Sequence, residues 1–166
     1  LDTIDPQQIL ISNNPPWNTI SVSVDSTLQS VVNKEKDPRI NKQLASNEIE
    51  NYTDNLQIYT DASQLTAERT GAAFYIPSED IEIYFRLQPT TIYSAELTAI
   101  KTALQFIQTT EIKDTKIAIF TDSLSVIKSL EKENSVHQTP EAEIARLIAS
   151  LQQTGIETKI VWIPGH

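Results

Sequence analysis

The chain has 166 residues, of which 13 are Lys or Arg and 22 are Asp or Glu, so its formal net charge is −9. This charge argues against a protein that binds nucleic acid tightly on its own, because the chain repels phosphates unless metal ions or another domain supply positive charge. The absence of cysteine excludes disulfides, thiol nucleophiles and cysteine zinc sites. No segment is apolar over the roughly 18 residues that a membrane-spanning helix needs, so we expect no membrane insertion.

Residues 1–55 are rich in Asn, Ser, Asp and Pro and carry only short apolar patches. We interpret this part as a connecting region that is partly irregular. Within it, alternation predicts a half-exposed strand at residues 19–24, and a short helix is predicted at residues 40–50.

Residues 56–166 show sharper patterns and are predicted to form one domain. Strands are predicted at residues 56–61, 71–76 and 81–87, and the turn at 77–80 joins the last two as an antiparallel hairpin. The three strands follow one another in sequence, so we expect an antiparallel set at one side of a sheet.

A long helix is predicted at residues 92–108, where apolar side chains recur every three or four positions. The run KIAIFT at residues 116–121 is almost continuously apolar. Such a run is typical of a parallel strand that helices cover on both faces, so we expect this strand to lie centrally.

The remaining residues predict two helices and a last strand. Ser123 can cap one helix, and Thr139-Pro140 can open another that ends at Gly155. The last strand is predicted at residues 156–163. This order predicts an α/β fold with a mixed five-stranded sheet, three antiparallel strands followed by parallel strands, flanked by helices.

Three acidic residues fall where this fold brings distant segments together. Asp61 and Asp122 each stand at the end of a predicted strand, and a right-handed crossover through the long helix makes these strands parallel neighbours. Glu96 lies in the first turns of that helix, on the face that carries Ile92 and Ala99, which we expect to contact the sheet. We therefore expect the three carboxylates to converge.

Clustered carboxylates repel one another unless they are protonated or neutralised, and Mg²⁺ is the first choice of counterion. A Mg²⁺ site with few protein ligands keeps positions for water and phosphate oxygens, which favours phosphodiester hydrolysis. Each acid also has an ordinary interpretation, as a strand-end turn former for Asp61 and Asp122 and as an exposed helix-start residue for Glu96. The hypothesis depends on the three acids together.

Five short motifs follow one another along the domain. They are IYTDAS (58–63), GAAFYI (71–76), TIYSAELTAIKTAL (91–104), IFTDSLSVIKSL (119–130) and VWIPGH (161–166). In this order they resemble the ribonuclease H family, and specifically the ribonuclease H domain of reverse transcriptases from non-long-terminal-repeat retrotransposons. The resemblance covers residues 56–166.

This resemblance implies a metal-dependent endonuclease that hydrolyses the RNA strand of RNA–DNA hybrids, with Mg²⁺ as cofactor and Mn²⁺ as a substitute. Asp61, Glu96 and Asp122 match three of the family's four metal-binding acids, and His166 matches its catalytic loop histidine. The candidate substrate-binding residues are Thr91, Ser63 and Ser123.

The family's fourth acid follows the Gly-His pair in a final helix, and this sequence ends at His166. We expect a site with three carboxylates to hold one ion and to work poorly. The alternative is a catalytically weak or inactive structural module of a polyprotein. A small-ligand-binding α/β domain is a further alternative, but the chain has three glycines and no glycine-rich phosphate loop.

The acidic balance implies that hybrid binding depends on the polymerase domain of a parent reverse transcriptase polyprotein. The resemblance also implies an intracellular protein and leaves the compartment and the oligomeric state open. Trp162 is expected to be a core residue, and His137 is expected to be solvated.

Overall fold

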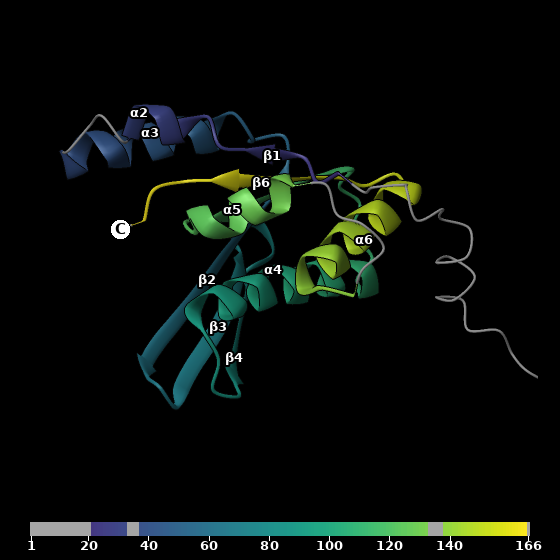
Figure 1. Ribbon diagram of the computed structural model, residues 1–166. Coiled ribbons are helices and arrows are strands. Elements are labelled where there is room, and N and C mark those ends of the chain that lie inside the picture. Colours follow the sequence, from purple (N-terminus) through teal and green to yellow (C-terminus); the bar gives the residue numbers. More distant parts are fainter. Residues whose placement is uncertain (1–20, 33–36, 133–137, 166) are drawn as a thin grey trace, which may run out of the picture.

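The computed structural model describes residues 21–32, 37–132 and 138–165 (Figure 1). Six strands form one sheet in the order β1-β6-β5-β2-β3-β4. The strands are β1 (Val24–Asp25), β2 (Leu56–Thr66), β3 (Arg69–Ile76), β4 (Ile81–Leu87), β5 (Lys116–Thr121) and β6 (Glu157–Trp162). The helices are α2 (Leu28–Val32), α3 (Pro38–Glu50), the short 3-10 helix η1 (Pro77–Glu79), α4 (Ile92–Thr109), α5 (Leu124–Glu131) and α6 (Pro140–Gln153).

The pairing of the strands confirms the predicted α/β class and its mixed sheet. Strand β3 pairs antiparallel with both β2 and β4, whereas β5 pairs parallel with β2 and with β6. The sheet has a sixth strand beyond the five that were predicted, because β1 pairs parallel with the edge of β6. None of the helices in the described ranges is long and apolar enough to cross a membrane.

Two local predictions were wrong. Strand β2 does not end at Asp61 but continues to Thr66, because β3 goes on pairing with it after its parallel pairing with β5 has ended at Tyr59. Ile92 was expected to face the sheet, but it is 44% exposed. It is the first residue of α4, and the buried residues of this helix begin only at Ala95. The predicted strand at residues 19–24 falls partly outside the described residues, and β1 begins at Val24.

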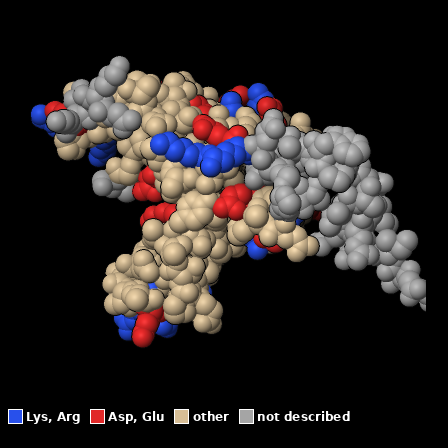
Figure 2. Space-filling model, viewed as in Figure 1, with Lys and Arg blue, Asp and Glu red and all other residues tan. Residues whose placement is uncertain are grey.

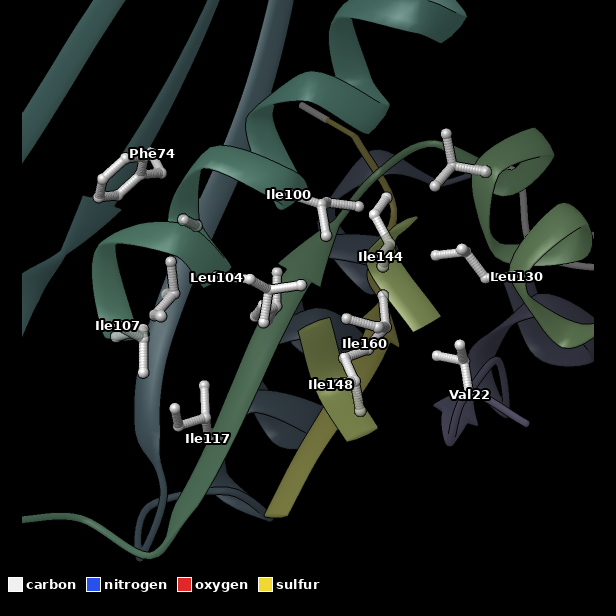
Figure 3. Packing of buried hydrophobic residues seen from close by; sticks show 14 of the residues in the cluster. Val22, Phe74, Ile100, Leu104, Ile107, Ile117, Leu130, Ile144, Ile148 and Ile160 are labelled. Atoms are coloured by element: carbon white, nitrogen blue, oxygen red, sulfur yellow. The ribbon is translucent and has the colours of Figure 1, made fainter. Parts of the chain in front are cut away.

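Helices cover both faces of the sheet around β5. Alternate residues of β5 point to opposite faces, and Ile117 and Ile119 join the main core with α4, α5 and α6. Figure 3 shows Ile100 and Leu104 of α4 packed in this core close to Ile144 of α6. The position of β5 confirms the central, doubly covered strand that its apolar run predicted.

A smaller cluster on the other face attaches α3 to the sheet. Its buried members are Ala118, Phe120 and Val161, and Ile49 and Tyr52 pack against them. Phe120 stacks on Tyr59 of β2 at a ring distance of 5.0 Å and meets the edge of Tyr52 at 5.9 Å. In Figure 1, α3 accordingly lies on the opposite side of β6 from α5 and α6.

Asp25 of β1 and Glu48 of α3 form a hydrogen-bonded pair of carboxyl groups where these elements meet. Tyr52 donates its hydroxyl hydrogen to Asp25, and the backbone N–H of Thr27 donates to Asp25 Oδ1 at 3.0 Å. Burial alone would raise the pKa of Asp25, but the hydrogen bonds from Glu48, Thr27 and Tyr52 outweigh it and lower that pKa. The hydrogen bond to Asp25, together with burial, raises the pKa of Glu48 to about 7. Glu48 therefore carries the shared proton.

We expect this pair to make the stability of the protein depend on pH. The pKa of Glu48 is raised by folding, so its stabilising effect is complete below about pH 4.3 and is lost as the pH rises through about 7. The lowered pKa of Asp25 acts in the opposite direction, because its effect is present above about pH 3.9 and is lost on acidification.

The variant Glu48→Gln keeps a donor for Asp25 without a titrating proton. Between pH 5 and pH 8, the free energy of unfolding of the wild type should therefore fall by about 1–2 kcal/mol more than that of the variant. Urea unfolding at the two pH values measures this difference. Equal decreases in the free energy of unfolding of the two proteins would contradict a proton shared by Asp25 and Glu48.

Candidate metal centre

Asp61, Glu96 and Asp122 come together at one edge of the sheet, as predicted. One carboxylate oxygen from each residue lies within 4.8 Å of the other two. The three residues are far apart in the sequence and come from β2, from α4 and from the residue directly after β5. No other group of three or more His, Asp or Glu side chains in the described ranges meets the same distance criterion.

The parallel pairing of β2 and β5 places the two aspartates. Their last paired residues are Tyr59 and Phe120, and each aspartate follows two residues later in its own chain segment. Asp61 is held by β3 on its other side, opposite Ala73, and its Oδ1 accepts a hydrogen bond of 2.9 Å from the backbone N–H of Ala62. Both aspartates are exposed to solvent.

Helix α4 brings Glu96 to the cluster from the covered face of the sheet. The hydroxyl of Thr91 caps this helix by accepting a hydrogen bond of 3.1 Å from the backbone N–H of Ser94. Ala95 and Ala99, on either side of Glu96, are fully buried, and the small side chains allow the helix to approach the sheet closely. Glu96 is only 5% exposed, which confirms that it faces the interior.

The electrostatics of the cluster are unfavourable in the absence of a cation. Burial, followed by the charges of Asp122 and Asp61, raises the pKa of Glu96 to about 8, against the opposing effect of a hydrogen bond from the Ala62 backbone. The buried Oε2 of Glu96 has no hydrogen-bond partner among the described residues. A buried carboxylate oxygen without a donor is costly, and a bound cation would satisfy it.

The donor set fits a hard divalent cation. Three carboxylates supply only oxygen ligands, which suit Mg²⁺, Mn²⁺ or Ca²⁺ and not the softer metals that prefer nitrogen and sulfur. Two of the three ligands are open to solvent, so a cation held here would keep positions for water or for a substrate oxygen.

The last described residues contact Asp122. The indole N–H of Trp162 donates to the backbone carbonyl of Asp122 at 3.1 Å, and Trp162 is 7% exposed, so its prediction as a core residue is confirmed. Gly165 lies against the carboxylate itself, because a Cβ built at this glycine would stand 3.0 Å from Asp122 Oδ2. Sequence reasoning did not identify either contact, although both residues belong to the WIPGH motif.

We expect Gly165→Ala to displace the Asp122 carboxylate by a few tenths of an ångström and to lower hydrolytic activity by about tenfold. Gly155→Ala is the matched control, since a Cβ there meets no atom within 4 Å but the backbone has a φ of +89°. The control should lower stability by about 1 kcal/mol and leave activity unchanged. Kinetics and thermal unfolding of both variants test this contrast, and equal activities would contradict it.

The predicted substrate-binding residues lie near the cluster and have local structural roles. Ser63 lies on the same strand as Asp61, two residues further along. Thr91 and Ser123 are the N-caps of α4 and α5, and Ser123 Oγ accepts from the Val126 N–H at 3.4 Å. His166 and His137 lie outside the described residues.

The fold is an α/β fold of the ribonuclease H-like class, and the acidic cluster at its sheet suggests binding of a divalent cation. Residues 53–166 match the family described as RNase H, which is more than half of the chain. The chain therefore belongs to the RNase H family and is an enzyme of that family, and its acidic cluster is consistent with a metal-dependent catalytic site. No curated protein matches the chain.

Proposed function

We propose that this protein hydrolyses the RNA strand of RNA–DNA hybrids, with Mg²⁺ held by Asp61, Glu96 and Asp122. The observation that carries the proposal is the convergence of three carboxylates from separate segments within 4.8 Å, one of them buried with an unpartnered oxygen. Membership of the RNase H family supplies the substrate class. Mn²⁺, which takes the same oxygen ligands, is the expected substitute.

The proposed catalytic roles of the three acids follow from their exposure to solvent. Asp61 and Asp122, on the solvent side, would hold the cation where the scissile phosphate enters, and Glu96 would orient the attacking water from the buried side. Bound Mg²⁺ would supply Lewis-acid stabilisation of the phosphate oxygens and an activated water. The water oxygen would form a bond to phosphorus and lose a proton to solvent as the bond from phosphorus to the 3′ oxygen breaks, and His166 would give the departing oxygen its proton.

Thr91, Ser63 and Ser123 are proposed as contacts to the substrate. Thr91 and Ser123 are the N-caps of α4 and α5, and backbone N–H groups at a helix N-terminus favour phosphate oxygens, which supports the proposal for these two residues. RNA would be distinguished from DNA through the 2′-hydroxyls in the shallow minor groove of the hybrid, so we expect cleavage that does not depend on sequence.

A cleavage assay tests the proposal. An end-labelled RNA is presented as an RNA–DNA hybrid, as a single strand and as an RNA duplex, with Mg²⁺, with Mn²⁺ or with a chelator. We expect cleavage of the hybrid alone, with either metal, and no cleavage with the chelator. Hybrid cleavage that persists in the chelator, or none at any metal concentration, would contradict the proposal.

We further propose that this domain is part of a retroelement reverse transcriptase and acts next to its polymerase domain. The sequence motifs YSAEL at residues 93–97 and WIPGH at residues 162–166, together with a net charge of −9, support an origin in such a reverse transcriptase. A polymerase domain on the same chain would supply positive charge and raise the local concentration of hybrid. The chain alone should therefore bind hybrid much more weakly than the polyprotein, and equal affinities in a binding titration would count against this partner.

A further inference from the structure

The face of β2, β3 and β4 that points away from α4 continues past the acidic cluster. The strand register places Asp61 opposite Ala73, and Ala73 opposite Tyr84. The next row on the same face consists of Ser63, Gly71 and Arg86. Because side chains alternate along a strand, the two rows form a continuous surface that begins at the metal-site residue Asp61.

This surface is hollowed into a groove of about 470 Å³. Its floor consists of small residues, Gly71 and Ala73, between the longer side chains of Tyr84 and Arg86 on one side and Asp61 and Ser63 on the other. β2 and β4 are two strands apart, so the groove is about 10 Å across. Figure 1 shows that these strands extend away from the helices at their far ends, where Leu65 and Arg69 are exposed to solvent.

Two arginines, Arg69 and Arg86, line the groove. Arg69 and Arg86 are both exposed, and neither forms an ion pair in the described ranges 21–32, 37–132 and 138–165. Arg69 stands at the start of β3, at the tip of the β2–β3 hairpin, where charged side chains gather in Figure 2. In a chain of net charge −9, these two arginines bring positive charge to a groove that begins at Asp61.

Tyr84 lies on β4 beside Arg86, across the groove from Asp61. It is 73% exposed, which is unusual for so large an aromatic side chain, and its hydroxyl donates to Glu82 at 2.5 Å. The ring is therefore held along the strand as a flat wall of the groove. An exposed aromatic beside arginines is a combination that nucleic-acid surfaces use, since the ring packs against sugar and base while the guanidinium binds phosphate.

We propose that this groove binds a phosphodiester of the hybrid that flanks the one cleaved, with Arg86 and Arg69 as the phosphate ligands and Tyr84 packed against the adjoining sugar. The proposal rests on the proposed function, because it assigns the hybrid to a surface continuous with the metal site. A guanidinium presents two parallel N–H donors that match phosphate oxygens, and the groove is too open to enclose a small ligand.

Salt-dependent binding of a labelled hybrid tests the groove. All proteins carry Asp122→Asn so that the RNA stays intact, which a gel verifies. Arg86→Ala should weaken binding by about tenfold and reduce the slope of log affinity against log salt by about 1, the loss of one phosphate contact. Arg86→Lys should restore the slope but only part of the affinity. Lys113→Ala removes an exposed charge next to the opposite end of β5 and should change neither quantity.

The strand that supplies the phosphate is identified with single neutral methylphosphonate linkages, placed in turn along the DNA and along a 2′-O-methyl-protected RNA strand. At one position in one strand, neutralisation should weaken binding by Arg86-containing protein and have no effect on Arg86→Ala. If Arg86→Ala has the same salt slope as Lys113→Ala, or if no such position exists in either strand, the groove does not bind a phosphate of the hybrid. The proposed cleavage of the hybrid is not affected by that result. If the protein without any substitution neither binds nor cleaves the hybrid, the proposed function is wrong as well.

Discussion

Replacing Asp61 with asparagine should lower metal-dependent cleavage of an RNA–DNA hybrid by about 10³-fold, the loss typical when an electrostatic partner of the transition state is removed. The substitution conserves the shape of the side chain and removes one of the three negative charges that converge within 4.8 Å. Asp61 is exposed on β2, and its Oδ1 accepts a local hydrogen bond from the Ala62 N–H, which the asparagine oxygen can also accept. The fold should therefore persist.

The matched control is Asp54→Asn, which removes an equal charge just before the opposite end of β2. Asp54 forms an exposed ion pair with Lys116 at 3.9 Å, and loss of such a surface pair should cost little stability. The initial rates of cleavage and the thermal unfolding temperatures of both variants are compared with those of the wild type. Activity of Asp61→Asn within tenfold of the control would remove Asp61 from the metal site.

Replacing Glu96 with glutamine should change stability and activity in opposite directions. In the metal-free protein at pH 9, Glu96 is ionised, nearly fully buried and close to two other carboxylates, so the neutral amide should raise the free energy of unfolding by about 2 kcal/mol or more. The amide can also donate a hydrogen bond to a neighbouring carboxylate. Hydrolysis should nevertheless fall by about 10²-fold or more, because a cation ligand is lost.

Added Mn²⁺ should reverse the order of stability. It stabilises the folded wild type in proportion to its affinity and should stabilise the Glu96→Gln variant much less. Glu157→Gln, which neutralises an exposed acid at the start of β6, is the control and should follow the wild type with and without metal. A metal-free Glu96→Gln protein that is less stable than the wild type would show that Glu96 has a structural role that does not depend on a cation.

The parts of the fold that were predicted correctly are those that depend on local pattern. The apolar run of β5 required burial on both faces, and its predicted bounds, 116–121, agree with the structure. The apolar stripe of α4 and the Thr139-Pro140 start of α6 are also local signals, and both helices begin at the predicted positions. The convergence of the acids was predicted because β2 and β5 are parallel neighbours, and their pairing with each other does end just before Asp61 and Asp122.

The errors arise where a partner strand decides the outcome. Asp61 reads as a strand-end turn former, but β3 pairs with β2 as far as Thr66 and keeps Asp61 inside a strand. β1 has only two residues and is a strand because β6 has a free edge. The alternation of IEIYFRL does indicate that Tyr84 and Arg86 share a face. Only the register through Ala73 reveals that this face is the one that carries Asp61.

Anomalous diffraction from a crystal of this protein soaked in Mn²⁺ tests the metal centre itself. We expect an anomalous peak at the edge of the sheet, bonded to carboxylate oxygens of Asp61, Glu96 and Asp122 at the distances of a Mn–oxygen bond. The proposed catalytic site would be contradicted if the density shows the three side chains directed apart or manganese bound only elsewhere. The ribonuclease H fold would then stand without support for metal-dependent hydrolysis.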